Sequence, residues 1–466
     1  MRYRGPRGTA RRVTAALGLV TAMVATAVGV GALGAAPASA SATTGVTAHQ
    51  ITIGATVPLT GPAAPGYSEI APAMDAVFGW VNAHGGVYGR KIKYIYLDDQ
   101  YDPAKTATLT RELVLQDHIF ADVGSLGTPT QLAVQKFLNS RRIPQIFVES
   151  GCDCWSSKSY PYSLGWEPPY TVEGKILGAY VAQHFGTKKV GILYQDTEFG
   201  QDVAKGVAME VPASAIVSQQ SYDATTLSGP LTTQMSALEA AGAQVVVMAT
   251  IPAATALAML PAYVIGFHPQ YVVDSVGSDS PTVGPLLSSF TAAGGGSAAE
   301  AKAASGLLYG VITEDYIPPE GLSTNPWVQV SAKLLKKYAP ALWKKDGLNG
   351  NTEYGVALAY TFVQALEAAG KNLTRAGLMR AIASKGRRFV TPGLVPLSYS
   401  KSVHYGYEGA EMIELAPTAP PVVTPTGRWP GAKVLTPVEQ TTPGRGPVKV
   451  YHGKVSTPPA SLRKTA

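Results

Sequence analysis

The chain has 466 residues, of which 46% are hydrophobic and 15% charged, and its formal net charge is +7. The first forty positions hold five arginines and no acidic residue, and positions 417–466 hold seven basic residues and one acidic residue, so the body between them is slightly acidic. A nucleic-acid-binding protein is excluded, because no segment of the body interleaves basic residues with aromatic ones.

Residues 1–40 are predicted to be a cleaved signal peptide. The arginine-rich start is followed by an apolar run at 13–33 and by Ala38-Ser39-Ala40, a small-residue cleavage pattern. The alternative is a single membrane anchor, since the apolar run is nearly long enough to cross a bilayer. We expect an exported, soluble protein located in the extracellular space, the cell envelope or the periplasm.

Residues 50–98 predict a complete strand–loop–helix–turn–strand unit. Ile51, Ile53, Ala55 and Val57 alternate with polar or small residues, as expected for a strand with two different faces. A loop, a helix that ends at residue 82, a glycine turn and a strand at 92–97 follow. In an open α/β sheet ligands bind at the carboxyl ends of the strands, so the loop after the first strand is a candidate wall of a binding site.

The same alternation continues along the body. Strands are expected at 120–124, 145–148, 189–194, 244–250, 270–274, 307–313 and 407–415. Helices are expected at 104–116, 131–140, 171–185, 201–210, 231–241, 253–265, 327–338, 352–369 and 374–384. This pattern is typical of parallel sheets covered on both faces. A body of about 375 residues is too long for one hydrophobic core, so we expect two α/β lobes between which the chain crosses more than once.

The remaining features are a tail and two cysteines. Residues 417–466 are rich in proline and threonine and have no apolar period, which predicts an extended or disordered arm. Cys152 and Cys154 are too few for a zinc site, because the histidines are scattered. A disulfide between them would close a small, strained ring, so we expect free or incidentally oxidised thiols rather than a disulfide.

Eight segments carry a family resemblance through their order and spacing: PLTGPAA (58–64), VNAHGGVYGRKI (81–92), DDQYDP (98–103), VGSLGTPTQLAV (123–134), IPQIFVESGCDCW (143–155), GWEPPYTVEGK (165–175), VGILYQDTEFGQDVAKG (190–206) and YGYEGAEMIEL (405–415). They resemble the solute-binding proteins of ABC transporters, in the leucine/isoleucine/valine-binding branch of the periplasmic-binding-protein type I class. The resemblance implies an α/β fold of two Rossmann-like lobes joined by a three-segment hinge, with residues 46–162 and 316–392 in lobe 1 and residues 163–312 and 398–416 in lobe 2. The lobes would close on a ligand.

The resemblance also implies a set of ligand-binding residues at the strand ends. The hydroxyls of Ser125 and Thr128 stand before a helix, where a solute carboxylate is favoured, whereas Thr130 is expected to cap that helix. We expect Glu149 either to pair with an ammonium group or to face solvent at the rim. The full expected set is Tyr67, Ser125, Leu126, Thr128, Glu149, Ser150, Gly151, Tyr170, Phe199 and Ser275.

Three further residues are interpreted structurally. Trp166 is expected to pack in the interior, and Asp98 and Asp99 are expected to form turn hydrogen bonds rather than a catalytic pair. Amino-acid-binding relatives have a tyrosine where this chain has Ile251, and an acidic residue after the strand that matches 270–273. The loop after that strand reads Asp274-Ser275-Val276-Gly277-Ser278-Asp279 here, and if Ser275 takes the acidic position, an ammonium group loses a partner. The ligand is therefore expected to be a small carboxylate solute, either a branched-chain amino acid or a related aliphatic or aromatic acid.

The predicted function is capture of this solute for an ABC importer. We expect a monomer that acts with membrane permease subunits and needs no cofactor or metal. No nucleophile elbow, zinc-protease motif or phosphate-binding loop is present, so no catalytic residue is assigned. A ligand sensor without transport, and a secreted α/β hydrolase, are the alternatives.

Overall fold

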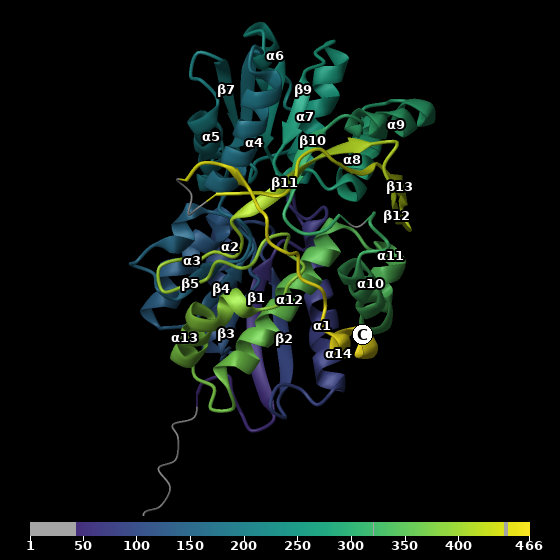
Figure 1. Ribbon diagram of the computed structural model, residues 1–466. Helices are drawn as coiled ribbons and strands as arrows, with labels where there is room; N and C mark the ends of the chain where they lie inside the picture. The colour runs from purple at the N-terminus through teal and green to yellow at the C-terminus, as the bar shows by residue number, and fades with distance from the viewer. Residues whose placement is uncertain (1–42, 320, 442–445) are drawn as a thin grey trace, which may run out of the picture. The chain divides into compact units, whose positions relative to one another are not determined.

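The computed structural model describes residues 43–319, 321–441 and 446–466 (Figure 1). The predicted signal peptide at 1–40 lies outside the described residues. Among the described helices, none combines the length and the apolar composition that a membrane crossing requires.

The first sheet has five parallel strands in the order β2-β1-β3-β4-β5. Its two longest strands, β1 and the edge strand β2, pair from Gln50 opposite Lys91 to Val57 opposite Asp98, so their carboxyl ends lie at the same end of the sheet. The strands are β1 (Gln50–Val57), β2 (Lys91–Asp98), β3 (Ala121–Val123), β4 (Gln145–Val148) and β5 (Ser163–Gly165). The helices that accompany them are α1 (Ile70–Ala83), α2 (Pro103–Leu115), α3 (Thr128–Ser140), α10 (Pro326–Tyr338), α11 (Pro340–Lys345), α12 (Gly350–Ala369) and α13 (Arg375–Lys385).

The second sheet has nine strands, of which β6 to β10 run parallel in the order β10-β9-β8-β6-β7. The late strand β11 pairs antiparallel to β10. The strands of this series are β6 (Val190–Gln195), β7 (Ile216–Tyr222), β8 (Val245–Ala249), β9 (Gln270–Val273), β10 (Ile312–Asp315) and β11 (Gly409–Ala416). Its helices are α4 (Tyr170–Phe185), α5 (Glu198–Glu210), α6 (Thr232–Ala240), α7 (Pro252–Val264), α8 (Ser280–Ala293) and α9 (Ala298–Ala304).

The chain passes between the two sheets more than once, as expected. After β5 it enters the second sheet, after β10 it returns to α10 and α12, which pack on α1, and after α13 it reaches β11 (Figure 1). The strands β5 and β7 and the helix α8 were not expected from the sequence. The strand β7 has only one fully buried residue, Tyr222, so it lacks the apolar signal of its neighbours.

The prediction of an extended or disordered tail is wrong for the segments that form strands and a helix on the body. Gly431 to Val434 form β14, which pairs antiparallel with β11, and short strands β15 (Glu439–Gln440) and β16 (Lys449–Val450) extend the sheet. Two other strands, β12 (Val422–Thr424) and β13 (Gly427–Trp429), form a hairpin. The tail then reaches α1 and α10 through α14 (Ala460–Thr465), where Leu462 is buried. Its strand-forming residues are few and scattered among prolines, so no period reveals them.

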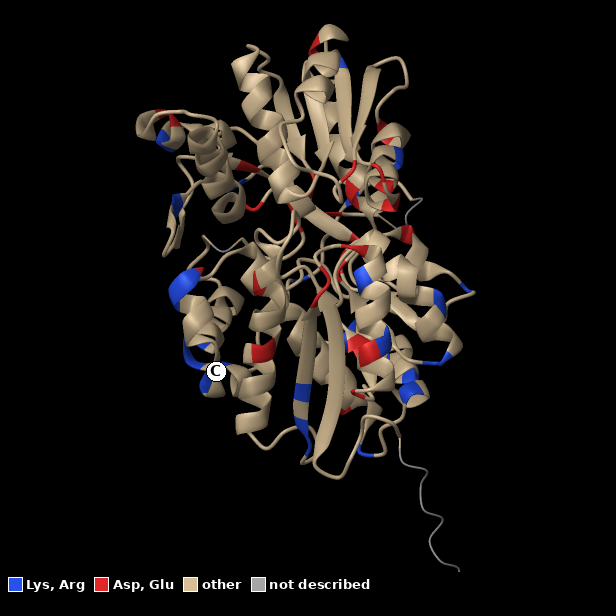
Figure 2. Cartoon of the chain, turned by 180° about the vertical axis from the view of Figure 1, so that it is seen from behind, with Lys and Arg blue, Asp and Glu red and all other residues tan. Residues whose placement is uncertain are grey.

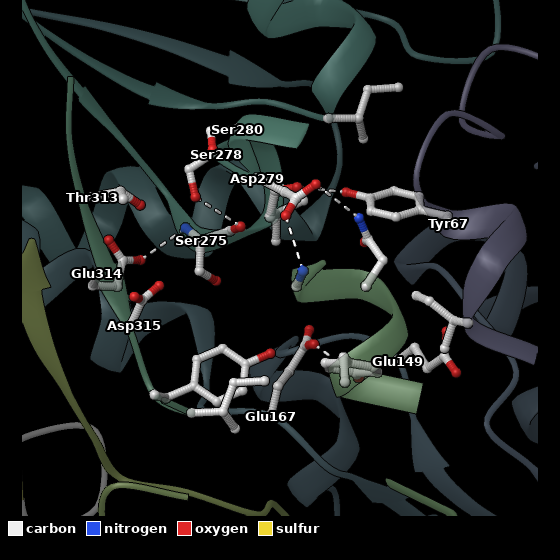
Figure 3. Close-up of a pocket in the computed structure, with 18 of the residues that line it drawn as sticks. Tyr67, Glu149, Glu167, Ser275, Ser278, Asp279, Ser280, Thr313, Glu314 and Asp315 are labelled. Atoms are coloured by element: carbon white, nitrogen blue, oxygen red, sulfur yellow. Dashed lines mark hydrogen bonds between the residues drawn. The ribbon is translucent and has the colours of Figure 1, made fainter. Parts of the chain in front are cut away.

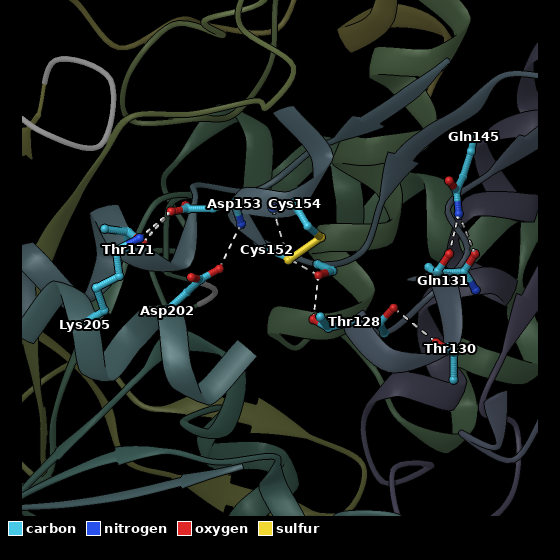
Figure 4. The surroundings of a disulfide bond; sticks show 12 residues. Thr128, Thr130, Gln131, Gln145, Cys152, Asp153, Cys154, Thr171, Asp202 and Lys205 are labelled. Carbon is cyan, nitrogen blue, oxygen red and sulfur yellow. Dashed lines mark hydrogen bonds and ion pairs between the residues drawn. A yellow bond between two sulfur atoms is a disulfide. The ribbon is translucent and has the colours of Figure 1, made fainter. Parts of the chain in front are cut away.

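The expectation of free thiols is also corrected, because Cys152 and Cys154 form a disulfide (Figure 4). The short 3₁₀ helix Asp153–Ser156 bends the chain there, so the two Cα atoms lie 5.1 Å apart. That separation is within the range that a disulfide spans.

Candidate functional site

A cavity of about 150 Å³ is lined by loops from both sheets (Figure 3). The first sheet contributes the loops after β1, β3, β4 and β5, and the second contributes those after β8, β9 and β10. The start of α12 and the tail segment around Val422 to Ala432 complete the wall. The carboxyl ends of parallel strands, where α/β proteins bind ligands, therefore surround one cavity.

Hydrogen bonds join the two sets of loops beside this cavity. The Tyr67 hydroxyl, which follows β1, donates to the Val276 carbonyl oxygen after β9 at 2.8 Å. The Gln195 amide at the end of β6 donates to the Tyr101 hydroxyl at 3.2 Å. The Gly350 backbone N–H at the start of α12 donates to the Asp279 carboxylate at 3.1 Å. Elements of both sheets thus fix the shape of the cavity.

Acidic side chains dominate the polar lining. Five of the lining residues have a carboxyl group, and among the described residues that line the cavity there is no Lys, Arg or His. In Figure 3 the carboxyl groups of Glu167 and Asp279 face the same central space from opposite sides. The five are Glu149, Glu167, Asp279, Glu314 and Asp315.

Burial raises the pKa of these groups. The pKa of Glu167 is raised to about 7 by burial, which outweighs the opposing effect of the hydrogen bond from Tyr354. Burial, and then the nearby charges of Glu411 and Asp279, raise the pKa of Asp315 to about 8. The pKa of Glu149 is also raised, first by burial and then by the charge of Glu167. No cation among the described lining residues opposes these shifts, so the cavity disfavours further negative charge.

Several of these oxygens lack a protein partner. Glu167 accepts a hydrogen bond from the Tyr354 hydroxyl at 3.1 Å through Oε2, but its Oε1 has no partner among the described residues. The same is true of Glu314 Oε2 and of both carboxyl oxygens of Glu149. A buried polar atom without a partner is costly, so such atoms at a cavity wall indicate groups that a ligand satisfies.

Three buried acidic residues form a triad at the wall of the cavity: Glu314, which lines it, and Glu173 and Asp274, which do not. One carboxyl oxygen of each lies within 4.8 Å of the others. The Ser275 backbone N–H donates to Glu314 at 3.1 Å, and its hydroxyl donates to Glu173 at 3.1 Å. Burial raises the pKa of Asp274 to about 7, so shared protons explain the close approach. The spacing of the triad would also admit a cation.

Seven of the ten expected ligand-binding residues line the cavity: Tyr67, Leu126, Thr128, Glu149, Tyr170, Phe199 and Ser275. The rings of Tyr170 and Phe199 lie side by side, with centroids 4.6 Å apart, and form part of one wall. Glu149 is buried, so the alternative that it faces solvent at the rim is wrong.

The other three expected residues lie behind the wall. The Ser125 hydroxyl oxygen accepts a hydrogen bond from the Thr56 backbone N–H at 3.0 Å and is occupied in joining β1 to the loop after β3. The hydroxyls of Ser150 and Thr128 are hydrogen-bonded to each other at 2.7 Å (Figure 4). At Gly151 a Cβ atom would lie 2.2 Å from the Pro168 carbonyl oxygen, so this position serves close backbone packing.

The structure also tests the structural interpretations. Trp166 is fully buried and packs edge-on against Tyr354 and Tyr407, as predicted. Asp98 accepts hydrogen bonds from the backbone of its own turn and of the loop after β1, which confirms a turn-forming role. The prediction that Thr130 caps α3 is wrong. Thr130 lies inside the helix, whose N-cap is Gly127, and its hydroxyl donates to the Gly127 carbonyl oxygen at 3.1 Å.

Sequence reasoning missed seven of the eleven aromatic and acidic residues that line the cavity. Glu167 follows β5, a strand that was not expected, so its place at a strand end was hidden. Tyr354 and Asn351 come from the start of α12, far along the chain, where no local pattern points to a ligand site. Tyr101 sits in the turn after β2 and looked like part of a turn motif.

Comparisons with known proteins agree with this geometry. A family model described as periplasmic binding protein matches residues 50–400. A Leu/Ile/Val-binding protein homolog 7 from Brucella abortus is 24% identical over 53% of this chain and 61% of its own length. A homolog 2 from the same species is 25% identical over 34% of this chain, and that match spans 43% of the relative, less than half its length.

Solved structures share the fold. A fatty acid ABC transporter substrate-binding protein from Thermomonospora curvata superposes with a TM-score of 0.70, at 22% identity over 89% of this chain and 97% of its own. A branched chain amino acid ABC transporter protein from Thermus thermophilus with bound valine superposes with a TM-score of 0.66, at 19% identity over 83% of this chain and 97% of its own. The chain belongs to the periplasmic binding protein family and has the type I fold of its Leu/Ile/Val-binding members.

Proposed function

We propose that this protein is the solute-binding component of an ABC importer, exported from the cell, which captures a small organic solute and presents it to permease subunits. The observation that carries this proposal is the cavity, which is lined by strand-end loops of both sheets and holds unpartnered polar atoms. The family membership supports it, and the named transporter relatives support the transport role.

We further propose that two lobes close on the solute. In this proposal lobe 1 contains residues 46–165 and 316–392, and lobe 2 contains residues 166–312 and 398–416. The boundary is placed after Gly165, instead of the expected residue 162, because β5 pairs with β4 of the first sheet.

The carboxylate solute expected from the sequence has one place to bind. At the start of α3 the Thr128 hydroxyl and the positive end of the helix dipole favour an anion. The other walls are acidic, so a carboxylate fits only at this corner, and a solute that also has an amine fits the cavity better. No feature of the described residues favours the sensing or hydrolase alternatives.

Thermal unfolding of the mature protein with a panel of small metabolites tests the proposal. A solute that binds only the native state raises the melting temperature by an amount that depends on its concentration. We expect at least one amino acid or amine to do so and to be recovered unchanged. Chemical conversion of the solute would contradict a binding role and favour the hydrolase.

A further inference from the structure

Resting on the proposed solute-binding function, we infer that the cavity selects solutes with a net positive charge, anchored by an ammonium group at Glu167, Glu314 and Asp315. The ligand class is then an aliphatic amine or an amino-acid derivative with an excess positive charge. This reverses the carboxylate expected from the sequence.

The balance of charges is the first argument. The lining has five carboxyl groups and, among the described residues, no side chain that bears a positive charge. Figure 2 shows that many acidic residues lie in the middle of the chain's fold, between the two sheets, whereas lysines and arginines lie mainly toward the periphery. An anion brought into such a cavity would have no cation to pair with, and burying an unpaired charge is costly.

The unpartnered oxygens are the second and independent argument. Glu167 is only 7% exposed and Glu314 is fully buried, yet each has one carboxyl oxygen without a partner among the described residues. A primary ammonium group has three N–H donors, and a substituted one has fewer. Because these donors point in different directions, a primary ammonium group would satisfy oxygens from more than one of these side chains. A carboxylate has no donor, so it could accept a hydrogen bond only from a protonated carboxyl group and would leave the ionised oxygens unsatisfied.

The aromatic wall is the third argument. Tyr67, Tyr101, Tyr170, Tyr316 and Tyr354 all line the cavity. The negative faces of tyrosine rings attract a cation, most strongly where water is excluded. The Tyr354 hydroxyl also donates a hydrogen bond to Glu167 Oε2 at 3.1 Å, and this bond holds the carboxyl group beside the Tyr354 ring.

The apolar part of the solute has a separate place. Ile317, Leu415, Val422 and Pro430 line the side of the cavity formed by β11, the segment after β10 and the tail. These residues suit a short aliphatic chain. An anchored ammonium with a small apolar body thus matches both parts of the lining.

Four probes of matched shape test the inference by isothermal titration. They are 3-methylbutylamine (cation), leucine (zwitterion), 4-methylpentanoate (anion) and 3-methylbutanol (neutral), so that the amine and the acid each represent one half of leucine. We expect the amine to bind at least about tenfold more tightly than the acid and the alcohol. Tighter binding of the acid or the alcohol would overturn the inference while leaving solute capture intact. If leucine is the only probe that binds, the requirement for a net positive charge is overturned. If none of the four probes binds and no metabolite in the thermal panel binds either, the proposed function is overturned as well.

Isosteric variants locate the anchor. Glu167→Gln and Asp315→Asn keep the shape of the side chain and remove its charge, and each is expected to weaken amine binding about tenfold. The matched control is Glu239→Gln on the exposed face of α6, which should leave the affinity unchanged. Melting temperatures measured without ligand show whether each variant folds. A second readout comes from the unmodified protein: titrations in two buffers of different ionisation enthalpy give the number of protons released when the amine binds. Amine binding that persists unchanged in both folded variants, with no proton release, would contradict the anchor.

Discussion

At the scale of single residues, buried carboxyl groups without cations set the chemistry of this protein. Glu353 in α12 is fully buried, and neither of its carboxyl oxygens has a partner among the described residues. Burial, and then the charge of Asp315, raise its pKa from 4.5 to about 8. Between these two values the native state binds more protons than the unfolded state, so the free energy of unfolding falls as the pH rises.

Glu353→Gln therefore should change the pH dependence of stability. Relative to the unmodified protein, we expect the variant to be little changed at pH 5 and to gain on the order of 2 kcal/mol at pH 8, because it no longer ionises. Urea unfolding at the two pH values measures the difference, and Glu239→Gln serves as the exposed control. Equal shifts at both pH values would show that Glu353 is not the titrating group.

At the scale of elements, the tail is part of the folded body. Leu462 of α14 is 2% exposed, whereas Val455 before it is 42% exposed. We expect Leu462→Ala to lower the free energy of unfolding by about 2–3 kcal/mol, since it leaves a cavity, and Val455→Ala to change it by less than about 0.5 kcal/mol. Chemical denaturation compares the pair. Equal, negligible effects would restore the prediction of a disordered arm.

The loop after β4 supplies a second prediction for an element. The disulfide between Cys152 and Cys154 closes a very short loop, for which chain entropy gives a stabilisation of about 1.5 kcal/mol. Reduction is therefore expected to lower the melting temperature slightly while the protein stays folded. Alkylation of the native, non-reduced protein should modify neither thiol. Modification of both would support the free thiols expected from the sequence.

The sequence predicts the helices and strands better than the residues of the ligand site, because a strand or helix is set by local pattern whereas the site is assembled from distant segments. The strands β1, β6 and β8 are continuous buried runs, so hydrophobic period and strand length identify them without tertiary information. The strand β14 exists because the edge of β11 offers unpaired backbone groups, and that context is absent from a local window. Tyr67, Tyr170 and Phe199 were expected because the family resemblance places ligand contacts in the loops beside recognisable elements. Glu167 was not expected, because the strand before it has only three residues.

At the scale of the whole molecule, the account depends on both sheets contributing to one cavity. The hydrogen bond from Tyr67 to Val276 joins the loop after β1 to the loop after β9, so under the proposed lobe closure it stabilises the closed state. Tyr67→Phe removes this bond and keeps the ring. We expect solute affinity to fall about fivefold, with little change in the melting temperature without ligand, measured by titration and thermal unfolding. An unchanged affinity would show that this contact does not couple the loops to binding.

Native mass spectrometry shows whether this protein holds a cationic solute without changing it, because it weighs the complex and then the released solute. For the protein saturated with 3-methylbutylamine, the account predicts one added mass equal to the intact amine, and release of the same molecule after denaturation. Absence of a complex with the amine, or release of a chemically altered molecule, would contradict a protein that holds a cationic solute without changing it.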